Sequence, residues 1–226
     1  MTLASIPTLV IFDCDGVLVD SEVVAARVLA RELTAIGIPL TANDCIARYT
    51  GISMGSVLSL LEEEWGRAPP ADFVERIRVA DAEAFRAELR PVAGVREAVR
   101  ALAHPKCVAS SGRLAKMRLT LSLTGLLPFF EPHLFSTEMV ARGKPAPDLF
   151  LYAAEQMSFA PARCVVVEDS QAGVRAAVAA GMQAFGFAGG SHCAPGHEGL
   201  LRSAGAALVF TRMAELPGLL ESVVRA

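Results

Sequence analysis

A short apolar run near the amino terminus, followed at once by two acidic residues, constrains this chain more than any other feature. Leu9 to Phe12 is an unbroken apolar run that contains two β-branched residues. Such a run predicts a strand buried on both faces, as in a parallel sheet covered by helices. Asp13 and Asp15 follow the run, separated by one residue. If the alternation of the strand continues, both carboxylates lie at its carboxyl end, where open α/β sheets bind their ligands.

Two carboxylates this close together repel each other. At neutral pH either one of them gains a proton or a cation neutralises both, and each outcome is chemically useful. Gly16 then allows the backbone to turn sharply away from the pair. Because a lone Asp-x-Asp is most often a pair of solvated acids in a loop, a functional interpretation needs support from elsewhere in the chain.

The rest of the chain alternates between short apolar runs and helical patterns. Further strands are expected at 106–109, 134–136, 164–167, 183–187 and 207–210, with helical periodicity between them. This alternation predicts an α/β fold with a doubly wound, Rossmann-like parallel sheet.

An insertion separates the first strand from the second. A βαβ crossover takes on the order of 30 residues, whereas more than ninety residues lie between Asp13 and Ser110. The intervening residues show helical patterns broken at Gly37, Gly66 and Pro91. We therefore expect a small all-helical cap domain at 20–89 over the carboxyl edge of the sheet, and an α/β core domain at 1–19 and 90–226.

Composition narrows the classes of partner. The formal net charge of −3 provides no basic surface for nucleic acid, and no apolar run reaches the length of a membrane span. The amino terminus lacks the basic and long apolar regions of a signal peptide, and the five cysteines form no CxxC pair. We expect a cytoplasmic protein without nucleic-acid or membrane partners, either a monomer or a weak homodimer.

Polar side chains follow the expected strands at the edge where their carboxyl ends meet. They are Asp13, Asp15, Ser110, Lys144 in a following loop, Glu168 and Asp169. Repulsion among four carboxylates at contact distances reaches several kcal/mol at an effective dielectric of about 20, so positive charge is required. Oxygen ligands of this kind suit Mg²⁺. Carboxylates, Mg²⁺, a lysine and a serine hydroxyl together suit a phosphoryl group.

Four segments occur in the order and context of a known set of motifs. The segments are Phe-Asp-x-Asp-Gly-x-Leu-x-Asp-Ser-Glu at 12–22, Val-Ala-Ser-Ser-Gly at 108–112, Gly-Lys-Pro-Ala-Pro-Asp at 143–148 and Val-Val-Val-Glu-Asp-Ser-x-Ala-Gly-Val at 165–174. Together they closely resemble the four motifs of the haloacid dehalogenase-like (HAD) hydrolases. The resemblance covers the chain from about Leu9 to Gly181, and the probability that all four motifs match by chance is very small.

The resemblance implies roles for individual residues. Asp13 would be the nucleophile and Asp15 the general acid/base, while Ser110 and Lys144 would bind the transferring phosphoryl group. Mg²⁺ would be held by Asp13, the backbone carbonyl of Asp15 and Asp169, with support from Glu168. The substrate would meet residues beside the second motif and in the break between cap helices, namely Ser111, Gly112, Thr50, Gly51 and Ser53.

The subclass follows from finer comparison. Dehalogenases of the superfamily lack the second Asp of the first motif, so Asp15 favours a phosphotransferase or phosphatase. The cap and fourth motif resemble the group of phosphoglycolate phosphatases, 6-phosphogluconate phosphatase and β-phosphoglucomutase. The His and Arg that such mutases carry in the cap correspond here to Ala25 and Met54. We therefore expect a Mg²⁺-dependent phosphatase acting on a small phosphorylated metabolite, a sugar or sugar-acid phosphate.

Two alternatives stay open. One is a phosphosugar mutase that uses the same phospho-Asp13. The other is a non-catalytic HAD fold that serves as a binding module, although the intact motifs argue against it.

Two further segments carry weaker signals. His192, Cys193 and His197 lie in a Gly/Pro-rich segment after an expected strand, and such a trio can bind Zn²⁺. Their spacing matches no common zinc signature and no fourth ligand is evident, so a solvent-exposed loop is the expectation. The mixed charges from Arg67 to Arg90 are expected to form a solvated face of the cap.

Overall fold

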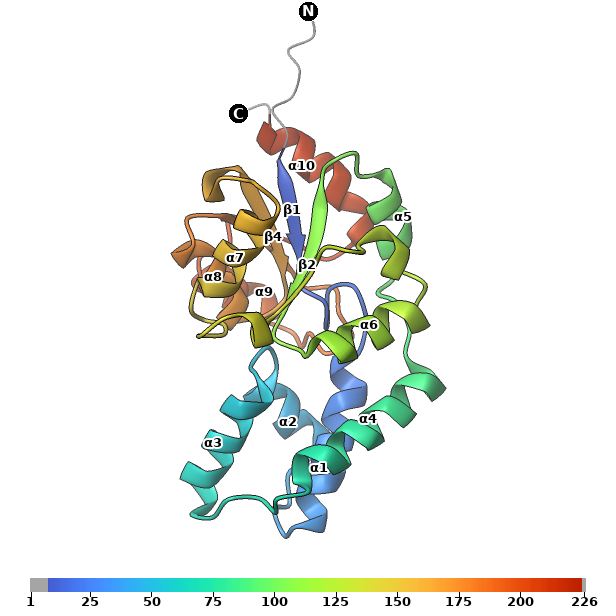
Figure 1. The fold of residues 1–226 in the computed structure, drawn as a ribbon, viewed down its shortest axis with the longest axis vertical. Helices are drawn as coiled ribbons and strands as arrows, with labels where there is room; N and C mark the ends of the chain where they lie inside the picture. Colours follow the sequence, from blue (N-terminus) through green and yellow to red (C-terminus); the bar gives the residue numbers. More distant parts are fainter. Residues whose placement is uncertain (1–7, 225–226) are drawn as a thin grey trace, which may run out of the picture.

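A six-stranded parallel sheet forms the centre of the molecule, as the computed structural model shows for residues 8–224 (Figure 1). The strand order is β3-β2-β1-β4-β5-β6, so the first strand of the chain lies in the middle of the sheet. The strands are β1 (Leu9–Phe12), β2 (Lys106–Ser110), β3 (Leu134–Ser136), β4 (Cys164–Glu168), β5 (Gln183–Phe187) and β6 (Leu208–Phe210). The doubly wound α/β fold expected from the sequence is confirmed.

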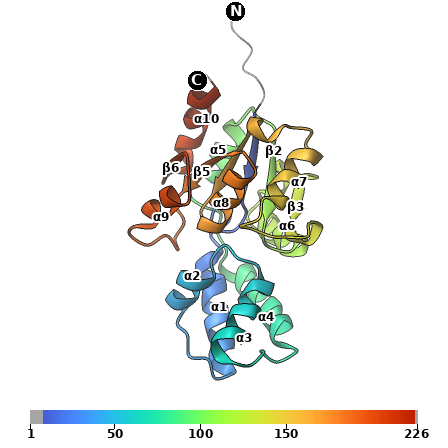
Figure 2. The same cartoon turned by 90° about the vertical axis from the view of Figure 1, so that its left-hand side faces the viewer.

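Helices cover both faces of this sheet (Figures 1 and 2). One face packs against α5 (Val95–Ala101), α6 (Leu114–Leu123) and α10 (Leu216–Val224), which share one apolar cluster with it. The other face packs against α7 (Asp148–Gln156), α8 (Gln171–Ala179) and α9 (His197–Ser203) in a second cluster. Short 3₁₀ turns at Leu127–Phe129, Thr137–Met139, Pro161–Arg163 and Met213–Glu215 complete the connections.

The sequence of β1 explains why this strand occupies the centre. Val10 and Phe12 enter the cluster on the α5, α6 and α10 side, whereas Leu9 and Ile11 enter the cluster on the opposite side. All four side chains are inaccessible to solvent. Each contributes roughly 1.5–3 kcal/mol by its burial. An apolar residue at every position is therefore required, and the strand directs Asp13 to the sheet edge.

Four helices lie between β1 and α5 and gather below the carboxyl edge of the sheet (Figures 1 and 2). They are α1 (Glu22–Ala35), α2 (Ala42–Tyr49), α3 (Met54–Trp65) and α4 (Phe73–Glu88). Their buried side chains form a third apolar cluster, which includes Leu33, Leu61 and Phe73 and contains no buried residue of the sheet. We call these four helices the cap.

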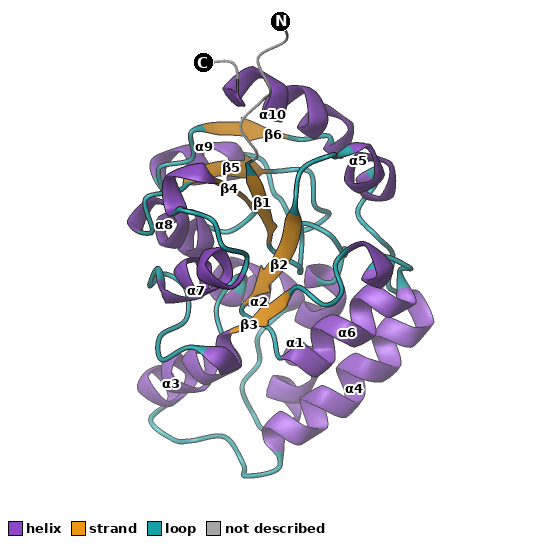
Figure 3. Cartoon of the chain, turned by 45° about the horizontal axis from the view of Figure 1, so that its top comes forward, coloured by secondary structure: helices purple, strands orange, loops and turns teal. Residues whose placement is uncertain are grey.

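The chain enters and leaves the cap through two adjacent segments. The amide of Asp20 donates to the carbonyl of Arg90 over 2.9 Å, and the amide of Val92 donates to the carbonyl of Leu18 over 3.0 Å. These crossings support our proposal that the domain boundaries lie at 19/20 and 89/90. The cap helix α4 also contacts the core helix α6, and Figure 3 shows the two lying side by side.

The structure adds detail that local patterns did not predict. Helix α9 begins directly after Gly196, a residue with a φ of +93°, and its seven residues are too few to give a clear helical periodicity. Helix α1 ends at Ala35, two residues before Gly37, which adopts a φ of +82°. None of the helices between residues 8 and 224 combines the length and apolar character needed to span a bilayer.

Candidate active site

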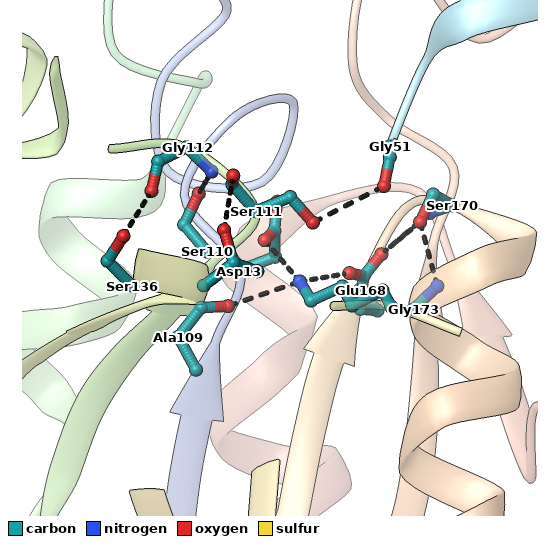
Figure 4. Close-up of polar contacts among 12 residues, drawn as sticks. Asp13, Gly51, Ala109, Ser110, Ser111, Gly112, Ser136, Glu168, Ser170 and Gly173 are labelled. Atoms are coloured by element: carbon teal, nitrogen blue, oxygen red, sulfur yellow. Dashed lines mark hydrogen bonds and ion pairs between the residues drawn. The ribbon is translucent and has the colours of Figure 1, made fainter. Parts of the chain in front are cut away.

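The ends of three neighbouring strands bring the polar groups together. Strands β2, β1 and β4 are adjacent, with Phe12 in register with Val108 on one side and Val167 on the other. The polar residues at these strand ends therefore lie at nearly the same level of the sheet. They are Asp13, Ser110 and Glu168, and more than 150 residues separate the first from the last. Figure 4 shows their side chains facing one another above the strands.

Lys144 is the central cation of this group. Its Nζ lies 2.5 Å from Asp13 Oδ1, 2.6 Å from Glu168 Oε1 and 3.1 Å from the carbonyl oxygen of Ala109. The Phe150 ring lies beneath the ammonium, with its centroid 4.9 Å away. Burial by itself would lower the pKa of Lys144, but Asp13 and Glu168 outweigh it and raise this pKa above its ordinary value. Lys144 is thus charged and held in a fixed position.

One lysine does not neutralise the carboxylates around it. Burial, reinforced by the charges of Glu168 and Asp169, raises the pKa of Asp13 well above its ordinary value despite the opposing effect of Lys144. Burial likewise raises the pKa of Glu168. One carboxylate oxygen from each of Asp13, Glu168 and Asp169 lies within 4.8 Å of the others. This buried set of hard oxygen donors, short of positive charge, fits Mg²⁺.

Hydrogen bonds fix both carboxylate oxygens of Glu168. While Oε1 accepts from Lys144, Oε2 accepts from the amide of Ser170 at 2.8 Å and from its hydroxyl at 2.9 Å. The Ser170 hydroxyl in turn accepts from the amide of Gly173 and caps α8. Gly173 is required here, because a Cβ at this position would collide with the Glu168 carboxylate.

Asp15 has different partners from Asp13, although both side chains line the same cavity. Its Oδ1 accepts from the Ser21 hydroxyl at 2.5 Å and lies 3.0 Å from Lys116 Nζ. Burial would raise the pKa of Asp15, but Lys116 and the Ser21 hydrogen bond outweigh it and hold this pKa below its ordinary value. Sequence reasoning missed Lys116. Its spacing, one helical turn after Gly112, is the signal that could have found it.

Hydrogen bonds within the loop after β2 and from Ser136 of β3 fix the conformation of this loop. The Ser110 hydroxyl accepts from the amide of Gly112 at 3.0 Å, and the Gly112 carbonyl accepts from the Ser136 hydroxyl at 2.8 Å. Ser111 reaches across to the cap, where its hydroxyl donates to the Gly51 carbonyl over 3.4 Å (Figure 4). Core and cap therefore come into contact at this loop, over the site.

The cap residues expected to bind substrate lie at this junction. Thr50, Gly51 and Ser53 all line the cavity. Gly51 has a φ of +80° and contacts Ser170 so closely that a side chain would not fit. The Ser53 hydroxyl accepts from the amide of Ser56 and caps α3, whereas Thr50 Oγ1 is buried without a hydrogen-bond partner among residues 8–224.

A cavity of about 650 Å³ lies between the core and the cap. It is lined by all the sequence-predicted site residues except Lys144 and Asp169, which lie beneath its wall. It also exposes charged side chains that sequence reasoning missed, namely Glu22, Arg78, Asp81, Arg113 and Lys116. Part of the 67–90 segment therefore faces the site, which corrects the expectation of a wholly solvated face. Arg48, a cation on the cap helix α2, does not line the cavity and pairs with Glu64 over 3.1 Å.

The acidic groups of the cavity are perturbed by their surroundings. Burial, reinforced by Asp15 and Asp169, raises the pKa of Glu22 to about 8. Burial also raises the pKa of Asp81 to about 6. A carboxyl whose pKa rises on folding stabilises the fold fully below its unfolded pKa and loses this contribution as pH rises through the folded pKa. For Glu22 that window runs from about 4.5 to about 8.

We therefore expect Glu22→Gln to stabilise the protein at pH 8 but not at pH 5. At pH 8 the gain in free energy of unfolding should be roughly 1–3 kcal/mol, because glutamine removes a buried charge and has nearly the same shape as glutamate. Urea unfolding at the two pH values measures it. The exposed Glu63→Gln serves as the control, and an equal effect of Glu22→Gln at both pH values would contradict the prediction.

The position of His192 differs from the one expected from the sequence. The segment that holds it was expected to be a solvent-exposed loop, but His192 is only 6% exposed and its Nε2 lies 2.8 Å from Asp169 Oδ2. Gly16, with a φ of +75°, packs against both residues, and a Cβ there would collide with Asp169. The glycine of the first motif is thus needed for the approach of this histidine as well as for the turn.

Comparison with known proteins places the chain in a family. Residues 7–181 match the family model of the haloacid dehalogenase-like hydrolases. A 6-phosphogluconate phosphatase of Escherichia coli is 33% identical over 189 residues, which are 82% of this chain and 85% of that protein.

Solved structures agree with this result. A haloacid dehalogenase-like protein of unknown function from Agrobacterium tumefaciens is 37% identical with a TM-score of 0.83, covering 96% of this chain and 98% of its own. A HAD family hydrolase from Deinococcus radiodurans, solved with bound phosphate and sodium, is 33% identical with a TM-score of 0.74 and 98% coverage of both chains.

Proposed function

The chain belongs to the haloacid dehalogenase-like hydrolases, and we propose that it is a phosphatase that hydrolyses a small phosphorylated sugar or sugar acid through an aspartyl-phosphate on Asp13. The observation that carries this proposal is the position of the Asp13 carboxylate. It lies at the base of the cavity between core and cap, 2.5 Å from a buried lysine and within reach of two further acids. The phosphatase named among the relatives acts on a sugar-acid phosphate, which supports the proposed substrate class.

In the first step an oxygen of Asp13 attacks phosphorus and the bond between phosphorus and the ester oxygen breaks. The leaving oxygen takes a proton from Asp15, so the sugar departs as a neutral alcohol. In the second step water attacks the aspartyl-phosphate and gives its proton to Asp15, which releases inorganic phosphate and restores Asp13. The proton that Asp15 gains in the second step is the one it delivers in the next turnover.

The surroundings of the two aspartates suit these roles. Lys144 keeps Asp13 in place and opposes the burial that would otherwise protonate it. Lys116, 3.0 Å from Asp15, favours the ionised form that accepts a proton from water. Ser110 lies buried beside Asp13, where its hydroxyl and the amides of the following loop can hold phosphoryl oxygens.

The metal expected from the family fits the acids present. We propose that Asp13, Asp169 and the carbonyl of Asp15 hold Mg²⁺, with Glu168 supporting the site through its contact with Lys144. Mg²⁺ bound there would neutralise charge on the nucleophile and on the phosphoryl oxygens. This set of oxygen donors is chemically suited to a hard cation.

The cap side of the cavity supports a polyol substrate. Glu22 and Asp81 offer carboxyl oxygens to hydroxyl groups, and Thr50 offers a hydroxyl that has no hydrogen-bond partner among residues 8–224. Arg78, from α4, supplies a cation on the cap side of the cavity that the segment at 50–55 lacks. A cation there suits the carboxylate of a sugar acid, and it is also a group that a mutase would need.

The phosphatase and mutase hypotheses are distinguished by the fate of the phosphoryl group. With β-glucose 1-phosphate, Mg²⁺ and a catalytic amount of glucose 1,6-bisphosphate, we expect no efficient formation of glucose 6-phosphate. The cavity has Ala25 and Met54 where such mutases carry a His and an Arg. With its preferred substrate the enzyme should release inorganic phosphate, which a phosphate assay across sugar and sugar-acid phosphates measures.

Two outcomes of that assay have clear meanings. Efficient isomerisation with little phosphate release would replace the phosphatase proposal by the mutase. Phosphate release that Asp13→Asn abolishes would support hydrolysis at this site, and a contaminating phosphatase would be unaffected by that change.

A further inference from the structure

A second cluster of ligand-type side chains lies behind the proposed active site and takes no part in the proposed chemistry. His192 and Cys193 belong to the loop that follows β5, and His197 is the first residue of α9. One ligand atom from each of the three lies within 4.8 Å of the other two. The chain thus brings together two imidazoles and a thiol, the donor types that zinc prefers.

The distance between two of these donors matches a tetrahedral site. Cys193 Sγ and His192 Nε2 are 3.5 Å apart. Zinc binds sulfur at about 2.3 Å and nitrogen at about 2.0 Å, so two such ligands at a tetrahedral angle lie roughly 3.5 Å apart. A zinc ion could therefore replace the proton between the two groups without moving either of them.

The third donor is oriented as metal-bound histidines are. His197 Nε2 lies 2.6 Å from the backbone carbonyl oxygen of Asp169. Because a carbonyl only accepts, this nitrogen carries the ring hydrogen, and the lone pair is left on Nδ1. A histidine ligand commonly donates its other ring N–H to such a carbonyl, which fixes its tautomer and direction.

Burial and exposure decide how a metal would reach the cluster. His192 is only 6% exposed, and its Nε2 is the ring nitrogen that contacts Cys193 Sγ. Cys193 is partly exposed, whereas the other four cysteines are buried, so an ion can reach it from solvent.

We propose that His192, Cys193 and His197 form a binding site for a soft divalent cation of the zinc class, with water as the fourth ligand. Zinc on His192 Nε2 would lie close to Asp169 Oδ2, which is 2.8 Å from this nitrogen and has no hydrogen-bond partner among residues 8–224. The charge of the zinc would draw the Asp169 carboxylate out of its place, so zinc binding behind the site lowers its activity. This second consequence rests on the proposed function, whereas zinc binding itself does not.

Cobalt is the direct probe of this geometry. Metal-free protein in excess Mg²⁺, which fills the carboxylate cluster, is titrated with Co²⁺ and then with Zn²⁺. We expect one equivalent of Co²⁺ to produce the near-ultraviolet thiolate band and the intense visible bands of tetrahedral coordination, and Zn²⁺ to remove both. Cys193→Ser should abolish the thiolate band. Cys193→Ser and His197→Gln should each weaken zinc binding about 100-fold or more in a chelator competition.

The matched control is His133→Gln, an exposed histidine on the loop before β3, which should leave the affinity unchanged. Circular dichroism of each variant verifies that it is folded. A wild-type protein without the thiolate band, or variants that bind zinc as tightly as the wild type, would overturn the proposal.

Activity provides the second readout. Zinc should inhibit phosphate release by the wild type at one equivalent in excess Mg²⁺, and Cys193→Ser should resist this inhibition. Zinc that binds at the predicted site without inhibiting would overturn the link to Asp169 and leave the site itself standing. Absence of phosphatase activity from every variant would count against the proposed function and not against the cobalt result.

Discussion

Asp13→Asn is expected to abolish phosphatase activity while leaving the fold intact. An amide oxygen is not a competent nucleophile toward phosphorus, so turnover should fall by about 10⁴-fold or more. The substitution keeps the shape of the side chain and an oxygen that can accept from Lys144, which lies 2.5 Å from Asp13 Oδ1. Phosphate release under saturating substrate and Mg²⁺ is the measurement.

Thermal unfolding separates this effect from loss of structure. Burial, together with the charges of Glu168 and Asp169, disfavours an ionised Asp13, so its neutral replacement should match or exceed the wild-type Tm in metal-free buffer. Asp72→Asn, which changes an exposed cap carboxylate, is the control and should retain full activity. Asp13→Asn protein that still turns over at more than a trace of the wild-type rate would eliminate Asp13 as the nucleophile.

Removal of divalent metal is expected to bring activity down to background. Asp13 and Glu168 share one buried lysine, and Asp169 lies within 4.8 Å of both, so the site needs further positive charge before a phosphoryl group can approach. Activity should disappear in excess chelator and return with Mg²⁺. Ca²⁺ should restore little, because its longer and looser coordination misplaces the nucleophile.

Asp169→Asn gives the matched test on the protein side. The amide keeps the shape of the side chain and an oxygen facing His192, so the free energy of unfolding should change little, while the Mg²⁺ concentration needed for half-maximal activity rises strongly. Asp20→Asn, at a carboxylate that binds Ser191 outside the cluster, should leave that concentration unchanged. Full activity in excess chelator would contradict the metal site as proposed.

The core fold and the family follow from local patterns in the sequence. The apolar residues of β1 predict a central strand, since a strand with both faces apolar is stable only when helices cover both. The end of such a strand determines where Asp13 lies, and parallel strands place Ser110 and Glu168 at the same edge. These inferences needed only periodicity and strand direction, which neighbouring residues encode.

The surroundings of those residues were decided by the tertiary structure. Whether Lys116 pairs with Asp15 depends on how α6 packs beside the end of β1. Whether Glu22 and Arg78 face the cavity depends on how the cap packs against the core, for example where α4 contacts α6. Contacts between such separate segments leave no local signal in the sequence.

His192 shows the same limit most clearly. Its Gly/Pro-rich neighbourhood is typical of an exposed loop, and its spacing from Cys193 and His197 matches no metal signature. Only the fold buries the ring against Gly16 and Asp169. Sequence alone determined which strand ends carry the proposed site residues, because strand direction is a local property. The partners of those strand ends were decided by packing between distant segments, because burial and charge pairing exist only once the chain has folded.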